Sequence, residues 1–125
     1  MVKEVITENA VIKSTKITME DHGCLTFWIF VDMGGSGCGI GGYCIGNGYV
    51  GAKQFSASSS GLEAMMRIMD VVGVGEWEKL PGKYIRVKHD GWGGTISEIG
   101  NILNDKWFNL KAFFEEKQKE AKGNE

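Results

Sequence analysis

Aromatic and basic side chains form the clearest chemical pattern in this sequence. Trp92 stands between two glycines, so its indole ring is expected to lie exposed in a loop, where it could stack on a purine base. Arg86 and Lys88 alternate along a strand-like segment and therefore share one face, from which either could reach a phosphate. Arg67 lies off the apolar stripe of a helix-like segment and offers a third cation. These residue types indicate a site for a planar ligand that carries phosphate.

Ordinary structural roles are also open to these residues. Arg67 follows Glu63 by four positions, which is the spacing of an ion pair on a helix surface. Trp92 can equally cap the hydrophobic core. The pattern alone therefore leaves ligand binding and structural support as alternatives.

The cysteines and histidines offer a weaker case for metal binding. His22, Cys24, Cys38 and Cys44 could supply one nitrogen and three sulfur ligands to zinc. Structural zinc sites usually place two to four residues between paired ligands, whereas one residue separates His22 from Cys24. We expect instead that the three cysteines are reduced thiols packed as small hydrophobic residues in a soluble cytosolic protein. No metal and no other cofactor is predicted.

Two glycine patterns resemble phosphate-binding loops but lack the required context. Residues 37–42 match G-x-G-x-x-G, yet a strand-like Tyr-Cys-Ile follows them where a dinucleotide site needs a helix. Residues 46–53, GNGYVGAK, have an alanine between glycine and lysine and no serine or threonine after the lysine. His89 and Asp90 are neighbours on a strand and so are expected to point to opposite faces. We therefore predict a protein that is not an enzyme.

Composition limits the classes of partner. The chain has 125 residues, of which 42% are hydrophobic, and this is enough for a single domain over 1–125. The last residues, 118–125, are expected to form a frayed tail. Fourteen basic and 16 acidic residues give a formal net charge of -2, which does not favour nucleic acid or a membrane surface as partner. No apolar run approaches the 18 residues typical of a membrane span.

The first half of the chain reads as strands. Residues 5–20 alternate as in a half-exposed strand, and a turn at 21–23 leads to 24–31, which is apolar on both parities and predicts a central strand. Residues 33–49 contain eight glycines. We expect them to form an irregular hairpin loop with short strand pieces at 43–45 and 49–50.

The second half adds two helices and a hairpin. Ser60 and Glu63 have the spacing of a capping box, and Gly73 and Gly75 end the helix. Segments 83–89 and 95–99 predict paired strands, 104–109 a loop, and Leu110 the start of a second helix. The first helix has an expected apolar stripe of Leu62, Met65, Met66, Met69 and Val72. The predicted class is α+β, a twisted antiparallel sheet with two helices packed on it and a glycine-rich hairpin loop.

Five motifs stand out along the chain, namely D-H-G at 21–23, GGSG-x-G-x-GGY at 34–43, V-G-V-x-x-W-E-x-L-x-G-K-Y-I-R-V-K at 72–88, G-W-G-G at 91–94 and K-W-F at 106–108. In these motifs the chain resembles the phage-encoded Thoeris anti-defence sponge family, which sequesters cyclic ADP-ribose signals made by bacterial TIR proteins without degrading them. The resemblance covers most of the chain.

The resemblance implies a function and a set of site residues. Sponges of this kind are oligomers built from dimers, with nucleotide pockets at protomer contacts, and they act in the cytoplasm of the infected bacterial host. Their pockets use an aromatic ring, a helix arginine and a late asparagine, for which the matching positions are Trp92, Arg67 and Asn101, with Asn104 close by. A second hypothesis is an inhibitor that binds a host defence protein directly through the glycine loop and exposed aromatic residues.

Overall fold

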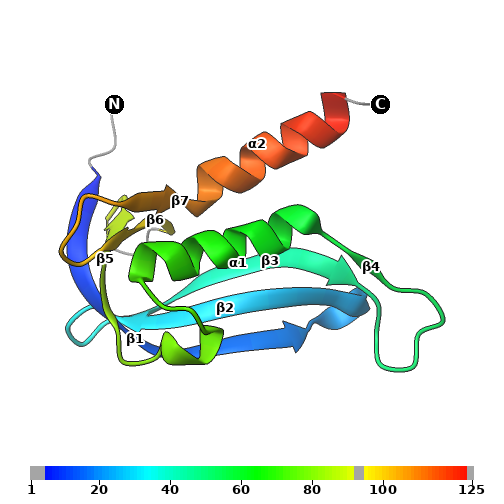
Figure 1. Ribbon diagram of the computed structural model, residues 1–125, viewed down its shortest axis with the longest axis horizontal. Coiled ribbons are helices and arrows are strands. Elements are labelled where there is room, and N and C mark those ends of the chain that lie inside the picture. Colours follow the sequence, from blue (N-terminus) through cyan, green and yellow to red (C-terminus); the bar gives the residue numbers. More distant parts are fainter. Residues whose placement is uncertain (1–4, 92–94, 124–125) are drawn as a thin grey trace.

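The computed structural model describes residues 5–91 and 95–123. In that part of the chain seven strands form one antiparallel sheet in the order β4-β3-β2-β1-β5-β6-β7, accompanied by two helices (Figure 1). The predicted α+β class is confirmed. The strands are β1 (Ile6–Met19), β2 (Cys24–Asp32), β3 (Gly37–Asn47), β4 (Ser56–Ala57), β5 (Tyr84–His89), β6 (Ile96–Asn101) and β7 (Trp107–Asn109); the helices are α1 (Ser59–Val72) and α2 (Leu110–Gly123), and short 3-10 turns cover Asp21–Gly23 and Trp77–Lys79.

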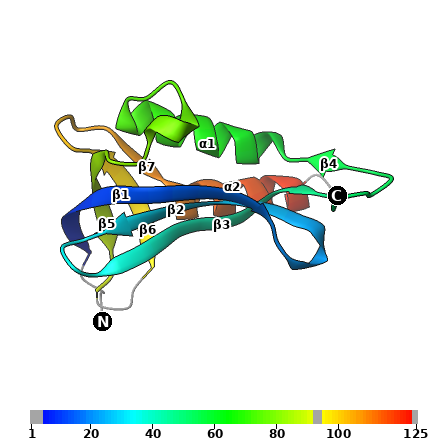
Figure 2. The same ribbon diagram turned by 90° about the horizontal axis from the view of Figure 1, so that it is seen from below.

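The hydrophobic core lies between α1 and one face of the curled sheet, as Figure 2 shows. Side chains from every long strand and from α1 contribute to it. Phe114 of α2 stacks on Tyr43 of β3 with ring centroids 4.0 Å apart, which places α2 beside the same core. The largest fully buried side chains are Phe27, Ile12, Ile29, Ile68, Leu80, Ile85, Ile99, Leu110 and Val87.

Strand β2 has two apolar faces, but only one of them is buried. Phe27 and Ile29 face the core, whereas Trp28 and Phe30 project from the opposite face, where Trp28 is half-buried and Phe30 is exposed. Their rings are nearly parallel, with centroids 6.1 Å apart. The Trp28 indole donates a hydrogen bond to Glu20, and this bond, with a second from Thr26, lowers the pKa of the Glu20 carboxyl. We call this side of the sheet the outer face.

The glycine-rich run is mostly a strand, which corrects the expected short strand pieces. A tight turn at 33–36 holds Gly34 and Gly35 at positive φ, and β3 then continues without a break through Asn47. The reason lies on β2, because a Cβ at Gly42 would be 2.7 Å from the Trp28 ring and one at Gly39 would be 3.3 Å from it. The glycines of β3 thus leave room for an indole lying across the strand.

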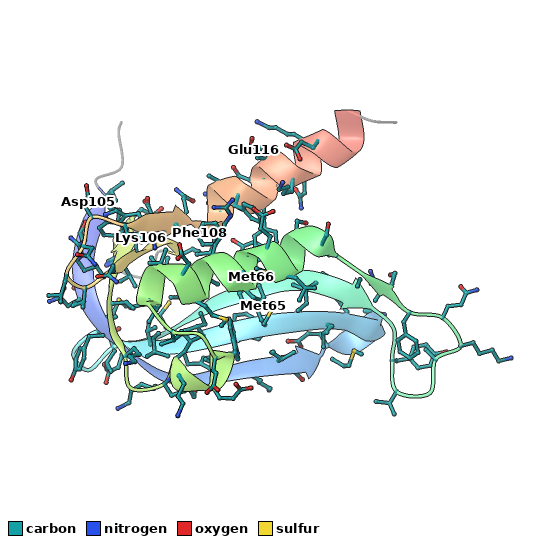
Figure 3. The ribbon with its side chains drawn as sticks, viewed as in Figure 1. Met65, Met66, Asp105, Lys106, Phe108 and Glu116 are labelled. Carbon is teal, nitrogen blue, oxygen red and sulfur yellow. A yellow bond between two sulfur atoms is a disulfide. The ribbon has the colours of Figure 1, made fainter. Side chains whose placement is uncertain are left out.

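Helix α1 begins earlier and faces differently than predicted. Ser58, rather than Ser60, caps it by accepting a hydrogen bond from the Gly61 amide at 3.1 Å. The predicted stripe is wrong at Leu62 and Met66, which are 56% and 67% exposed; Met66 is labelled in Figure 3. The buried face is instead formed by small and branched residues, Gly61, Ala64, Ile68 and Val71.

Close packing explains that orientation of α1. A Cβ at Gly61 would lie 2.5 Å from a side-chain carbon of Ile45, so only glycine lets the first turn approach β3 this closely. At the other end Gly73 adopts the left-handed conformation, with φ 93, and its amide bonds the Met69 carbonyl. The predicted glycine stop is confirmed.

The C-terminal half follows the prediction with two differences. Ile85, Val87 and His89 of β5 are buried as their alternation predicts, and β6 pairs with β5 as a hairpin. Part of the predicted loop at 104–109 is strand, since β7 pairs with β6. Residues 118–123 of the expected tail continue α2. Neither described helix is both long and apolar enough to cross a membrane.

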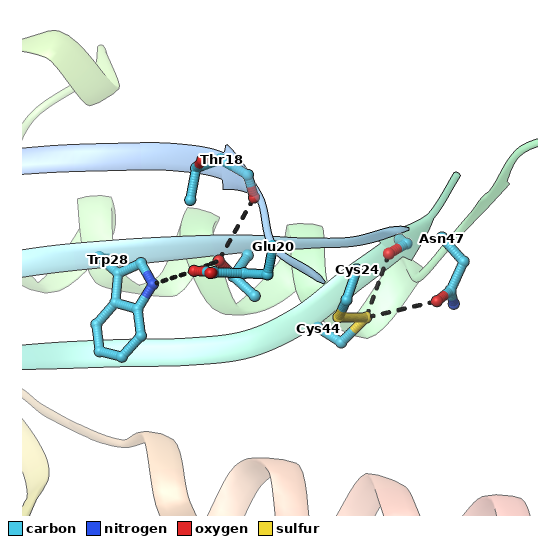
Figure 4. Close-up of a disulfide and its surroundings, with 8 residues drawn as sticks. Thr18, Glu20, Cys24, Trp28, Cys44 and Asn47 are labelled. Atoms are coloured by element: carbon cyan, nitrogen blue, oxygen red, sulfur yellow. Dashed lines mark hydrogen bonds between the residues drawn. A yellow bond between two sulfur atoms is a disulfide. The ribbon is translucent and has the colours of Figure 1, made fainter. Parts of the chain in front are cut away.

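Two cysteines are joined rather than reduced. The structure contains a disulfide between Cys24 of β2 and Cys44 of β3, with the two Cα atoms 5.6 Å apart (Figure 4). Cys44 lies opposite Thr26, and the strand register shifts between Thr26 and Leu25. Whether the two cysteines meet therefore depends on the register of β2 and β3. Cys38 is free and half-buried. The expectation of three reduced thiols is therefore wrong for Cys24 and Cys44.

Candidate functional site

The candidate site is a cluster on the outer face where β5, β6 and β7 lie side by side. Arg86 of β5 lies opposite Gly100 of β6, which in turn lies opposite Trp107 of β7. The guanidinium carbon of Arg86 is 4.6 Å from the centre of the Trp107 ring, and the Lys88 ammonium nitrogen is 4.1 Å from it. Both cations therefore interact with the indole π-system.

Gly100 makes this arrangement possible. A Cβ at Gly100 would lie 2.5 Å from a carbon of the Trp107 ring, so the ring occupies the space that a side chain would fill. Trp107 also donates from its indole nitrogen to Asp105 at 2.9 Å. The indole is consequently fixed in position, and we call Arg86, Lys88, Gly100 and Trp107 the tryptophan cluster.

Arg86 is anchored by the turn between β6 and β7. Its Nε donates to the Asn101 carbonyl at 2.8 Å, and its Nη2 donates to the Asn104 carbonyl at 2.7 Å. These two charge-assisted bonds use two of the five N–H groups of the guanidinium. The cluster is therefore preorganised around an arginine whose orientation is already set.

The Asn101 side chain connects the same turn to α1. Its amide nitrogen donates to the carbonyl of Val71 at 2.8 Å, which satisfies one of the unpaired carbonyls at the end of α1. Its amide oxygen accepts from the backbone amides of Leu103 and Asn104, both at 2.9 Å. Lys106 adds an ion pair to Asp70 of α1 at 2.9 Å; Figure 3 shows Lys106 and Phe108 beside that end of the helix.

Lys88 is the least constrained cation of the cluster. Its ammonium is 3.7 Å from the Glu98 carboxylate, which is a long ion pair, and its side chain is half-buried. At 3.7 Å the two groups are beyond hydrogen-bond distance, so this contact holds Lys88 only weakly. Lys88 can therefore turn toward an incoming phosphate at small cost.

The structure brings together the side chains of two of the five predicted site residues, namely Arg86 and Lys88, while Asn101 meets Arg86 only through its backbone carbonyl and directs its side chain to α1. Arg67 has other partners, since its Nε bonds Glu63 at 2.7 Å and its guanidinium lies 5.9 Å from the Phe113 ring centre. The helix-surface ion pair considered for Arg67 is thus present. Trp92 lies outside the described residues. Trp107 was not predicted as a site residue. Its place in the sequence, after the predicted strand pair whose first strand carries Arg86 and Lys88, could have suggested it.

A polar cavity of about 440 Å³ lies at the other end of β5 and β6. Its wall includes His89, Asp90 and Thr95 from the strand ends and Lys111 and Glu115 from α2. The charge of Glu115 also acts on Tyr43 of β3. Burial, and then this charge, raises the pKa of Tyr43. None of the predicted site residues in the described chain lines this cavity.

His89 is committed to a contact that the sequence reasoning did not find. Its Nε2 donates to the Glu8 carboxylate, and its Nδ1 lies 3.1 Å from both the amide nitrogen and the carbonyl oxygen of Gly91. Glu8 is 81 positions away and reaches His89 through the pairing of β1 with β5. Both ring nitrogens are therefore occupied by groups of the protein.

Metal ligands do not gather in the described part of the chain. There, no group of three or more His, Cys, Asp or Glu side chains is placed to hold a metal ion. The disulfide also uses two of the sulfur atoms of the alternative zinc set.

No protein-family model, curated protein or solved structure matches the chain.

Proposed function

We propose that the protein binds and sequesters a cyclic ADP-ribose-type nucleotide, without cleaving it, in the cytoplasm of an infected bacterial host. The motifs that resemble the sponge family suggest this ligand. The observation that carries the proposal is the convergence of Arg86 and Lys88 on one fixed indole ring, with Arg86 oriented by the Asn101 carbonyl. Two cations beside an aromatic ring suit a ligand that combines phosphates with a base.

Lys88 supplies the mobile charge in this proposal. It leaves its long contact with Glu98 and meets a phosphate oxygen, while the remaining guanidinium N–H groups of Arg86 donate to the same group. Trp107 keeps the Arg86 guanidinium in place while Lys88 moves. Binding of this kind needs no general base, in agreement with a histidine at position 89 whose two nitrogens are already occupied.

Assembly completes the proposed pocket. Arg67 lies on α1 beside Phe113 and away from the tryptophan cluster of its own chain. In a homo-oligomer built from dimers, Arg67 of a second copy can face the cluster, so that the pocket lies at a protomer contact. Neither a cofactor nor nucleic acid or membrane is part of this mechanism.

Calorimetry with cyclic ADP-ribose isomers tests the proposal. Replacing Lys88 by alanine should weaken binding about 10- to 100-fold, because a charge-assisted phosphate bond contributes about 1.5–3 kcal/mol. The matched control is Lys119→Ala, which removes an exposed lysine of α2. Denaturing the complex should return the nucleotide chemically unchanged. Binding by Lys88→Ala equal to that of the parent would contradict the site, and recovery of a cleaved product would contradict sequestration.

A second function is favoured by an exposed apolar arm at residues 48–55, between β3 and β4. Tyr49, Val50 and Phe55 of this arm are 63%, 93% and 66% exposed. Exposed aromatic groups of this size suit a protein partner, so the alternative is an inhibitor that binds a host defence protein directly. Saturating nucleotide at 100 times Kd should raise the stability of a sponge by about 2.7 kcal/mol. No thermal shift with any isomer would favour the alternative.

A further inference from the structure

The disulfide lies at the base of the arm. Cys24 directly follows Gly23, whose carbonyl accepts a hydrogen bond from the Gly48 amide at 2.8 Å. Cys44 lies three positions before Asn47, the last residue of β3. We propose that the Cys24–Cys44 disulfide is a redox-sensitive clasp that sets the order of the arm. This proposal does not depend on nucleotide binding.

Few other contacts hold the arm. Strand β4 is two residues long and pairs with β3 at Gly46 and Asn47 only. At Gly23 the two backbones touch, because a Cβ there would lie 2.4 Å from the Gly48 carbonyl oxygen. The Phe55 ring lies over Gly48 in the same way. The approach of Gly23 to Gly48 depends on keeping the end of β3 close to the start of β2, which the disulfide does together with the last two pairs of the β2–β3 ladder.

The position of the disulfide makes it accessible and keeps it separate from the core. Cys24 shares the outer face of β2 with Trp28, whereas Phe27 and Ile29 of the same strand are buried on the other side. Cys44 is exposed and Cys24 is half-buried. A thiol reductant can therefore reach Cys44, and loss of the bond removes no buried apolar contact.

The chemistry is exchange with a dithiol. One thiolate of the reductant attacks the exposed Cys44 sulfur, forms a mixed disulfide and releases Cys24 as a thiolate, which takes up a proton. The second thiol of the reductant then displaces Cys44, which leaves as a thiolate and is protonated in turn. The reductant loses two electrons and two protons and ends as a disulfide, and the protein gains two thiols.

Two measurements on the full chain test the clasp. Thiol titration of the native protein, after equilibration with oxidised glutathione, should find one free thiol, Cys38, and three after treatment with dithiothreitol. Hydrogen exchange of residues 46–57 should become roughly 10-fold faster on reduction, while β1 and β5 keep their protection. Cys44→Ser should show the fast exchange with or without reductant. Cys38→Ser is the matched control and should respond as the parent does.

Three results would overturn the proposal. Three titrating thiols after equilibration with oxidised glutathione would mean that the bond does not form. Equal exchange of 46–57 in both redox states would mean that the bond does not order the arm. Faster exchange throughout β1 and β5 would make the disulfide a support of the whole fold. If Cys44→Ser does not fold, Cys24→Ser and the reduced parent provide the same comparison.

Discussion

Asn101 links two parts of the structure with one amide group, so replacing it by alanine is a strong test of the arrangement. The substitution removes the donor to the Val71 carbonyl and the acceptor for the Leu103 and Asn104 amides. The end of α1 and the turn between β6 and β7 then lose their connection. The same turn supplies the carbonyls that orient Arg86, so the tryptophan cluster should loosen as well.

The size of the effect follows from the three hydrogen bonds. Each contributes about 0.5–1.5 kcal/mol net, and because Asn101 is half-buried we expect a loss of about 2–3 kcal/mol in the free energy of unfolding. An unfolding entropy of about 2.1 cal/mol/K per residue over 125 residues converts this loss to a fall of about 8–11 °C in Tm.

Urea denaturation and calorimetry of Asn101→Ala measure this loss directly. Asn104→Ala is the matched control, because Asn104 enters these contacts through its backbone and its position is exposed. It should change the free energy of unfolding by less than about 0.5 kcal/mol. Equal stability of Asn101→Ala and the parent, or an equal loss in Asn104→Ala, would refute the role assigned to the Asn101 amide.

Two further substitutions examine packing and ionisation. Gly100→Ala places a methyl group 2.5 Å from the Trp107 ring and should lower the unfolding free energy by about 1–3 kcal/mol, because the ring is displaced from Arg86 and Lys88. The control Gly75→Ala meets open space and should be nearly neutral, so equal stability of the two variants in urea would contradict the close packing. Burial, and then the charge of Glu115, raises the pKa of Tyr43 above its ordinary value of 10.0, so the native state favours the neutral phenol. The resulting stability is complete below about pH 10 and is lost as the pH rises through the folded-state pKa. Tyr43→Phe should flatten this decline in the free energy of unfolding. An unchanged slope would argue against the assignment of the decline to Tyr43.

Patterns within a few residues correctly predicted the local elements. Alternation over 5–20 and 83–89 predicted β1 and β5, because burial of one strand face appears as a period of two, and the run at 24–31, apolar on both parities, predicted β2. The left-handed stop at Gly73 was predictable because few residues other than glycine adopt that conformation readily. The pairing of Arg67 with Glu63 was likewise available from a spacing of four.

The candidate site was only partly predictable. A shared strand face placed Arg86 and Lys88 together, and this part is local. Their meeting with Trp107 depends on Gly100 lying between them in a three-strand register. Alternation does not reveal register, because shifting one strand by two residues preserves the same faces.

Several features were decided by partners distant in the sequence. The run at 33–49 became mainly a strand because Trp28 needs the space above Gly42, and α1 turned Met66 outward because Gly61 fits against Ile45. The Cys24–Cys44 bond and the His89–Glu8 contact join residues 20 and 81 positions apart. The sequence by itself determined β1, β2, β5, β6 and the two helices, because those preferences are local. Only the tertiary structure decided which glycines receive a ring, which helix face is buried and which thiols meet, because close packing and strand register depend on atoms contributed by other elements.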